Sequence, residues 1–328
     1  MTEVEPAVAS TANRLCPAMA DAIAQEMRAD ERVVIWGEDI RTGVMSTTRG
    51  LHAEFGDDRV VDTPISEAGF LGAALGAAMN GLRPIVDIMY TSFTYVAFDQ
   101  LVNQIGRAQY MTGGQVSAPV TVIAAAGACG FAAQHSECSH PMLMNAGGLK
   151  VLFPSNSHQA FWLTRAALRS DDPVLVLYQP SLASARGEVG PHPLGIGDVQ
   201  VESHGSDVSI FAIGLMAARA RRAAKQLAAE GIGAEVVDVC TLAPLPIAAL
   251  TDSLRRTGRA VVVDEARLSC SAASEISATL AEHAFDALKA PIVRVAVQNV
   301  PIPYAPSLES HVIPSEADIV DAVRRVAA

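Results

Sequence analysis

Residues 62–79 read "DTPISEAGFLGAALGAAM", and the pattern in this stretch decides the fold. The length and alanine content from Glu67 to Met79 predict a helix, and the stretch "RVVDTP", residues 59–64, predicts a short strand before it. Beyond Glu67 the predicted helix carries no charge and no side chain that forms strong hydrogen bonds. Because a buried charge is costly unless a partner pairs with it, Glu67 is either a first-turn acid that favours the helix dipole or a functional group.

The composition is that of a globular protein with a large core. The chain has 328 residues, 50% of them hydrophobic and 18% charged, which fits two domains of ordinary size. The formal net charge of −11 argues against nucleic acid or an anionic membrane surface as a partner. The longest uncharged apolar stretches are shorter than the ~18–20 residues that a membrane span needs.

Cysteine usage and the N-terminal sequence both favour a cytoplasmic protein. The five cysteines are scattered without a CxxC pair, which fits a reduced protein better than a disulfide framework or a zinc site. The N-terminal "MTEVEPAVAS" carries two acids and no base, and it resembles neither a secretory signal nor an Arg-rich transit peptide.

Strand-like and helix-like stretches alternate along the chain. Strands are predicted at 32–39, 59–64, 82–90, 118–127, 149–155 and 173–180, and helices at 13–30, 67–79, 93–111 and 157–169. A second series has strands at 207–214, 234–240, 259–266 and 291–299, and helices at 215–231, 244–258, 271–285 and 315–328. This alternation predicts two three-layer α/β domains with mainly parallel sheets.

The two series are separated by a stretch rich in Gly, Pro and Ser that lacks periodicity. We therefore place the first domain at 1–185, a linker at 186–206 and the second domain at 207–328. In open parallel sheets ligands bind at the carboxyl ends of strands, and Glu67 stands at such an end.

A second group of reactive side chains occurs in "GFAAQHSECSH", residues 130–140. A zinc site would use His135, Cys138 and His140, but no matching cluster supplies a fourth ligand. Cys138 could instead be a nucleophile, although neighbours in sequence are rarely catalytic partners in a fold. The simplest alternative is a polar loop after a buried strand.

The segment "DTPISEAGFLGAALGAAMNGLRPIVDIMYTSFTYVAFDQLVNQIGRAQYMTGGQ" resembles the β subunit of thiamine-diphosphate-dependent 2-oxo acid dehydrogenases, in the transketolase-like superfamily. These subunits belong to the components that decarboxylate pyruvate or branched-chain 2-oxo acids or that act on acetoin. "AAQHSEC", "GLKVLFPSN", "DDPVLVLYQP", "GSDVSIFAIGLM", "TLAPL" and "VPIPYAPSLE" fit the same family. The resemblance runs from about residue 12 to the end. It implies a pyrimidine-binding domain, a transketolase C-terminal-like domain, and oxidative decarboxylation of a 2-oxo acid with acyl transfer to a lipoyl group.

The resemblance also implies roles for individual residues. Glu67 matches the glutamate that accepts a hydrogen bond from the aminopyrimidine ring and so favours the tautomer that takes the C2 proton. Phe93 matches the aromatic side chain that packs against this ring, and Ile65 and Met89 match further pocket positions. His135 matches the histidine near the substrate that assists proton transfer and acyl transfer to the lipoyl group.

The metal ions implied by the family divide between two chains. The cofactor's diphosphate needs Mg²⁺, which the superfamily binds through a Gly-Asp-Gly motif, and no "GDG" occurs in this sequence. The resemblance therefore implies an α subunit that carries this motif, with the cofactor at the interface of an α₂β₂ assembly. "AALRSDDP" matches a potassium loop of several relatives, with ligands at the carbonyls of Ala167, Leu168 and Ser170 and at Asp172. The alternative is a helix C-terminus capped by acids.

Some segments depart from the family pattern. "VIAAAGACG" and "SHPMLMNAGG" are atypical, and Asn145 stands where the family has a histidine before "GLKV". These segments lie beside the expected substrate pocket and the approach of a lipoyl acyltransferase. A transketolase-like or acyloin-forming enzyme without a lipoyl acceptor and a non-catalytic scaffold subunit therefore stay open. A plain nucleotide-binding domain is disfavoured because no GxGxxG follows an early strand.

Overall fold

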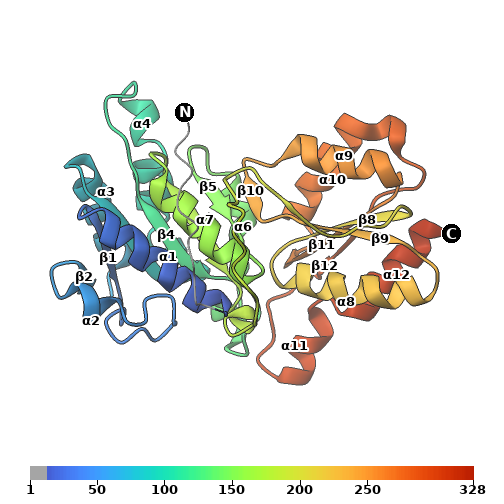
Figure 1. Cartoon of the computed structure of the whole chain (residues 1–328), viewed down its shortest axis with the longest axis horizontal. Coiled ribbons are helices and arrows are strands. Elements are labelled where there is room, and N and C mark those ends of the chain that lie inside the picture. The colour runs from blue at the N-terminus through green and yellow to red at the C-terminus, as the bar shows by residue number, and fades with distance from the viewer. Residues whose placement is uncertain (1–12) are drawn as a thin grey trace.

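The computed structural model describes residues 13–328, which form two mainly parallel sheets covered by helices (Figure 1). The segment "MTEVEPAVAS" and the start of the predicted first domain lie outside the described residues. The first sheet has seven strands in the order β10-β5-β6-β4-β3-β1-β2. Their bounds are β1 Val33–Gly37, β2 Val60–Asp62, β3 Arg83–Tyr90, β4 Thr121–Ala125, β5 Lys150–Leu152, β6 Val174–Tyr178 and β10 Thr241–Ala243. All neighbours pair parallel except β10 with β5.

Helices cover both faces of this sheet because alternate strand residues point to opposite sides. Ile85 of β3 packs in the same cluster as α1 (Leu15–Ala29) and α7 (Ser157–Arg169). Val86, one residue on, packs in the cluster that includes α3 (Glu67–Met79). The predicted helices over 67–79 and 157–169 are confirmed to the residue.

The second sheet has five strands in the order β12-β11-β8-β9-β7. Its elements are β7 Gln200–Ser203, β8 Val208–Ala212, β9 Ala234–Asp238, β11 Ala260–Arg267 and β12 Val293–Val297, with α8 Leu215–Ala229, α9 Ile247–Thr257, α10 Ala272–Ala284 and α12 Glu316–Ala327. Helices α8 and α12 lie on one face and α9 and α10 on the other (Figure 1). The strand β7 falls inside the segment predicted as a linker, 186–206, and pairs antiparallel with β9. The remaining pairs are parallel, so the predicted α/β fold class is confirmed.

The helix predicted over 93–111 is wrong as a single α-helix. A 3₁₀ turn, η1 (Thr91–Tyr95), a π-helical segment, η2 (Asp99–Ile105), and a short α4 (Ala108–Met111) take its place. The widened turns end where Gly106 N–H donates to the carbonyl of Leu101, five residues back (3.0 Å). The other short elements are α2 Leu51–Phe55, α5 Ala132–His135, α6 His140–Met144, α11 Pro306–Val312, η3 Pro180–Leu182 and η4 Phe285–Ala287.

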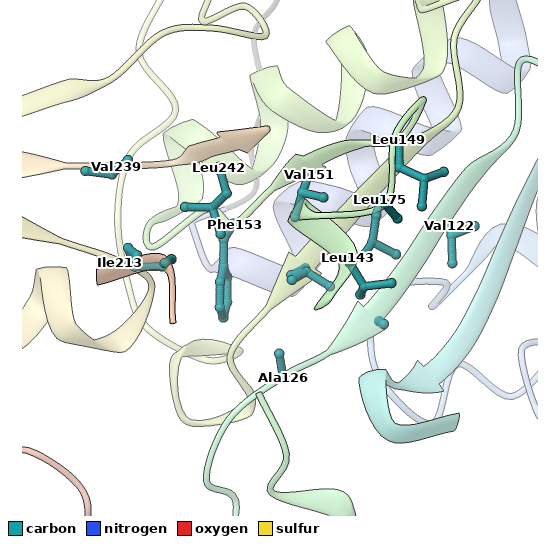
Figure 2. Close-up of a cluster of buried hydrophobic side chains, with 14 of the residues drawn as sticks. Val122, Ala126, Leu143, Leu149, Val151, Phe153, Leu175, Ile213, Val239 and Leu242 are labelled. Atoms are coloured by element: carbon teal, nitrogen blue, oxygen red, sulfur yellow. The ribbon is translucent and has the colours of Figure 1, made fainter. Parts of the chain in front are cut away.

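The two sheets share one hydrophobic core. Figure 2 shows Phe153, just after β5, beside Leu242 of β10 and Ile213 at the end of β8. Phe153 N–H donates to the carbonyl of Cys240 (2.8 Å). The second half of the chain, which carries the second sheet, is therefore hydrogen-bonded directly to the first half, which carries all but one strand of the first sheet. Strand β10 then joins the first sheet, and the halves are therefore connected by packing as well as by covalent chain. Among residues 13–328, no helix is long and apolar enough to cross a membrane.

A buried carboxyl group also links the halves. Asp238, at the end of β9, is fully buried and accepts hydrogen bonds from Ser155 Oγ and from Gln159 Nε2 (2.9 Å for the latter), both in the first half. Burial raises the pKa of Asp238 to about 7, and the hydrogen bonds and Arg221 only partly oppose that rise. Asp238 therefore binds its proton more tightly in the folded chain than in the unfolded one.

Asp238→Asn should flatten the dependence of stability on pH. The ordinary pKa of 3.8 rises to about 7 on folding, so the contribution of Asp238 is fully present below pH 3.8 and is lost as the pH rises through 7. We expect this group to lower the free energy of unfolding by about 2–3 kcal/mol between about pH 5 and pH 7, and the asparagine variant to lack that fall. Urea unfolding at both pH values measures it. Asp286→Asn, on an exposed acid, is the control, and an unchanged slope in Asp238→Asn would refute the assignment.

Candidate functional site

The predicted catalytic and cofactor-binding residues lie along the carboxyl edge of four adjacent strands, β2, β1, β3 and β4. Glu67 begins α3 after β2, Met89 lies near the end of β3, and His135 lies in the segment after β4. The strand register keeps these ends level, since Gly37 of β1 pairs with both Asp62 of β2 and Asp87 of β3. This is the edge where open parallel sheets bind ligands.

Glu67 lies beyond β2, the outermost strand of the sheet at this end. Its side chain is half-buried, and no ion pair joins it to another residue between 13 and 328. The neighbouring Ile65 is 82% exposed, so it presents apolar surface beside Glu67. The predicted burial of Glu67 is therefore only partial in the isolated chain.

Glu38 is a second acid at this edge, and it was not predicted from the sequence. It follows β1 directly, and its Oε1 is buried without a hydrogen-bond partner among the described residues. Burial, together with the negative charges of Glu67 and Asp39, raises the pKa of Glu38. The signal for Glu38 was the acidic end of the predicted strand 32–39, which stands at the same edge as Glu67.

An aromatic cluster surrounds His135. The centre of its imidazole lies 4.7 Å from the ring centre of Tyr90, 5.6 Å from that of Phe93 and 6.4 Å from that of Phe131, each edge-on. Tyr90 and Phe93 also contact each other, with ring centres 5.5 Å apart. The structure therefore brings together Phe93 and His135, which the resemblance assigns to one site, and it adds Tyr90 and Phe131 to them.

Met89 is held in a backbone conformation that L-residues rarely adopt. Its φ is 63°, and its N–H donates to Asp87 Oδ1 (3.0 Å). Asp87 is buried, its other oxygen accepts from Thr47 Oγ1 (2.7 Å), and burial raises its pKa. Strain of this kind persists only where the surroundings impose it, and it is common at functional sites.

Cys138 and His140 do not form a metal site or a catalytic pair with His135 in this structure. His140 is fully buried, with Nε2 3.1 Å from Asp264 Oδ1 of β11. Burial raises the pKa of the Cys138 thiol well above its usual range, which disfavours the nucleophilic thiolate. Within residues 13–328, no group of three or more His, Cys, Asp or Glu side chains is placed to hold a metal ion.

The predicted potassium loop is occupied by side chains of this chain. Arg83 donates to the carbonyls of Leu168 (3.0 Å) and Ser170 (2.6 Å). Ala167 O accepts the N–H of Ser170 (3.1 Å), and the Asp172 carboxylate pairs with Lys150 Nζ at 2.7 Å. Each of these four oxygens thus already accepts a hydrogen bond or pairs with a cation of this chain. The potassium ion stays a prediction.

Comparison with known proteins agrees with this architecture. Residues 15–184 match the transketolase pyrimidine-binding domain, and residues 197–319 match the transketolase C-terminal domain. A solved structure described as a split-gene transketolase, an inactive β4 tetramer, aligns with a TM-score of 0.80 at 25% identity, covering 96% of this chain and 99% of that one.

Two further relatives have higher sequence identity to this chain than that solved structure has. The chain is 43% identical to the acetoin:2,6-dichlorophenolindophenol oxidoreductase subunit beta of Cupriavidus necator, over 94% of this chain and 95% of that protein. It is 40% identical to the pyruvate dehydrogenase E1 component subunit beta of Rhizobium meliloti, over 94% of this chain and 68% of that protein. The chain belongs to the transketolase-like family that includes the β subunits of acetoin oxidoreductases and of pyruvate dehydrogenase E1 components, as its sequence predicted.

Proposed function

We propose that this chain is the β subunit of a thiamine-diphosphate-dependent enzyme that acts on a 2-oxo acid or on acetoin. The observation that carries the proposal is the placement of Glu67, Phe93 and His135 along one edge of a parallel sheet, with the rings of Phe93 and His135 in contact, in a chain of this family. The names of the relatives support the substrate class.

The residues present fit the pyrimidine end of the cofactor. Glu67 offers a half-buried carboxylate that has no ion pair among the described residues, while Phe93, Met89 and the exposed Ile65 offer apolar surface to a flat ring. Glu67 would accept a hydrogen bond from a ring nitrogen and so hold a proton on the pyrimidine. When bound, the cofactor supplies a carbon nucleophile and an electron sink. His135 would hold or donate a proton at the substrate oxygen.

A partner α subunit would supply the diphosphate and Mg²⁺ ligands. The side of α3 away from the core exposes Gly69, Ala73 and Gly76, which would allow another backbone to approach closely. This uncharged face begins beside Glu67, so an α chain covering it would also complete the burial of Glu67. An α₂β₂ assembly is the simplest closed arrangement of two such chains.

Co-expression with an α chain that carries the Gly-Asp-Gly motif tests the proposal. We expect the two chains to co-purify, and turnover of pyruvate, a branched-chain 2-oxo acid or acetoin to require both chains, thiamine diphosphate and Mg²⁺. Reduction of an artificial electron acceptor reports the reaction without a lipoyl protein. Full activity of this chain alone, or an assembled complex that is inert with all three substrates, would overturn it.

The acceptor is proposed to be a lipoyl group on an acyltransferase, with an aldehyde or ketone as the second candidate. The second candidate is favoured by Asn145, which stands where the family has a histidine. Turnover with lipoamide supports the first candidate. Product formation with free aldehydes and none with lipoamide would favour the second.

His135→Ala is expected to lower turnover about 100-fold in the assembled enzyme, because a placed proton donor or acceptor contributes at least that much. Binding of thiamine diphosphate should stay unchanged, since Glu67 and Phe93 are intact. Steady-state kinetics and a cofactor titration measure the two effects. His204→Ala, on an exposed histidine, is the matched control, and full turnover in His135→Ala would refute the role of His135.

A further inference from the structure

The segment that carries His135 has little structure of its own. His135 ends α5, a helix of only four residues that begins with Ala132 at a φ of 65°. Such a short helix is unstable without tertiary contacts. The imidazole forms no hydrogen bond with any residue between 13 and 328, so its position follows that of the backbone and of the surrounding rings.

The second half of the chain contacts the part of this segment that precedes His135. Glu265, a buried residue of β11, accepts a hydrogen bond from Ala128 N–H (2.7 Å). Glu309 of α11 accepts another from Gly130 N–H (3.1 Å). A Cβ at Gly127 would lie 2.8 Å from Glu265 Oε2, so the carboxylate and the segment approach as closely as glycine allows.

The second half also holds the segment after His135. Arg267, the last residue of β11, forms a two-pronged ion pair with Glu137, with N–O distances of 2.5 and 3.0 Å. Glu137 lies two residues beyond His135, and its carbonyl accepts Gly127 N–H (3.1 Å) and Thr91 Oγ1 (2.9 Å). Arg267 therefore pairs with Glu137, whose carbonyl is hydrogen-bonded both to Gly127, at the start of the segment, and to Thr91 of the 3₁₀ turn that carries Phe93.

We propose that Glu265 and Arg267, both at the end of β11, are positioning residues for His135. The second half of the chain would thus set the geometry of a site whose reacting groups all lie on the first half. A displacement of about 1 Å can lower a catalysed rate substantially, so two attachments on either side of His135 matter for turnover. The inference rests on the proposed role of His135.

Arg267→Met tests the inference in the assembled enzyme. We expect turnover to fall about tenfold with KM and the binding of thiamine diphosphate unchanged, because a misplaced proton donor affects the reaction more than binding. Arg324→Met is the matched control. Arg324 lies on α12, near the C-terminus (Figure 1), and forms the same kind of two-pronged pair with Glu230 (2.8 and 3.0 Å). Loss of this pair should leave turnover unchanged.

A double-mutant cycle separates positioning from a general structural effect. In the His135→Ala background, Arg267→Met should cause no further loss, because the group that Arg267 positions is already absent. The milder Glu137→Gln should behave as Arg267→Met does, which guards against a folding defect in one variant. Equal losses in both backgrounds, or full turnover in Arg267→Met and Glu137→Gln, would overturn the inference alone. Full turnover in His135→Ala would overturn the role of His135 and this inference with it.

Discussion

Glu67→Gln is expected to lower turnover of the assembled enzyme by about 10³-fold while the two chains stay associated. Glutamine keeps the shape of the side chain but cannot hold a proton on the pyrimidine as an anion can. Glu67 is half-buried and has no ion pair within the described residues, so this substitution leaves no buried cation unpaired. Steady-state turnover at saturating cofactor, with gel filtration of the complex, measures both parts of the expectation.

The matched control is Glu316→Gln. Glu316 is also a first-turn acid, at the start of α12, and it pairs with Arg222 on the surface. If Glu67 only favours its helix dipole, both substitutions would cost about 0.3–1 kcal/mol of stability and neither would affect turnover. Unchanged turnover in Glu67→Gln would therefore favour a scaffold subunit over a catalytic one.

Phe153→Ala is expected to lower the free energy of unfolding by about 3–5 kcal/mol. The Phe153 side chain is 2% exposed, its ring centre lies 5.6 Å from that of His140, and a Cβ at Gly214 would lie 3.1 Å from its ring carbons. These neighbours come from both halves of the chain, so the cavity left behind would weaken the shared core rather than one domain.

Calorimetry of the isolated chain measures this effect. We expect one thermal transition in the parent chain and one transition at lower temperature in Phe153→Ala, because the halves unfold together. Phe285→Ala is the control, since its side chain is 75% exposed and its loss should change stability by less than about 0.5 kcal/mol. Two separate transitions, only one of them shifted by the substitution, would contradict a shared core.

Local pattern was sufficient to predict most elements of the fold. The apolar run after Glu67 and the amphipathic stretch 157–169 gave helices with the observed bounds, because their sequence preference and their packing agree. The helix over 93–111 failed because its middle widens into π turns. The pairing of β10 with β5 could not be predicted, since it joins segments about ninety residues apart that carry no local signal for each other.

The candidate site also has parts that the sequence could predict and parts that it could not. The resemblance predicted Glu67, Phe93 and His135, which the structure places along one sheet edge, although their roles stay predictions. The contacts of Glu265 and Arg267 with the His135 segment could not be predicted, because they connect residues more than 120 positions apart. Glu38 was within reach of the sequence, as the acid at the end of a predicted strand.

A titration of thiamine diphosphate, with Mg²⁺ present, into this chain alone and into its complex with an α chain tests the central claim most directly. The account predicts saturable binding to the complex, weakened by Glu67→Ala, and no binding to the isolated chain, because half of the cofactor's ligands belong to the other polypeptide. Equally tight binding to the isolated chain, or binding to the complex that Glu67→Ala leaves unchanged, would contradict it.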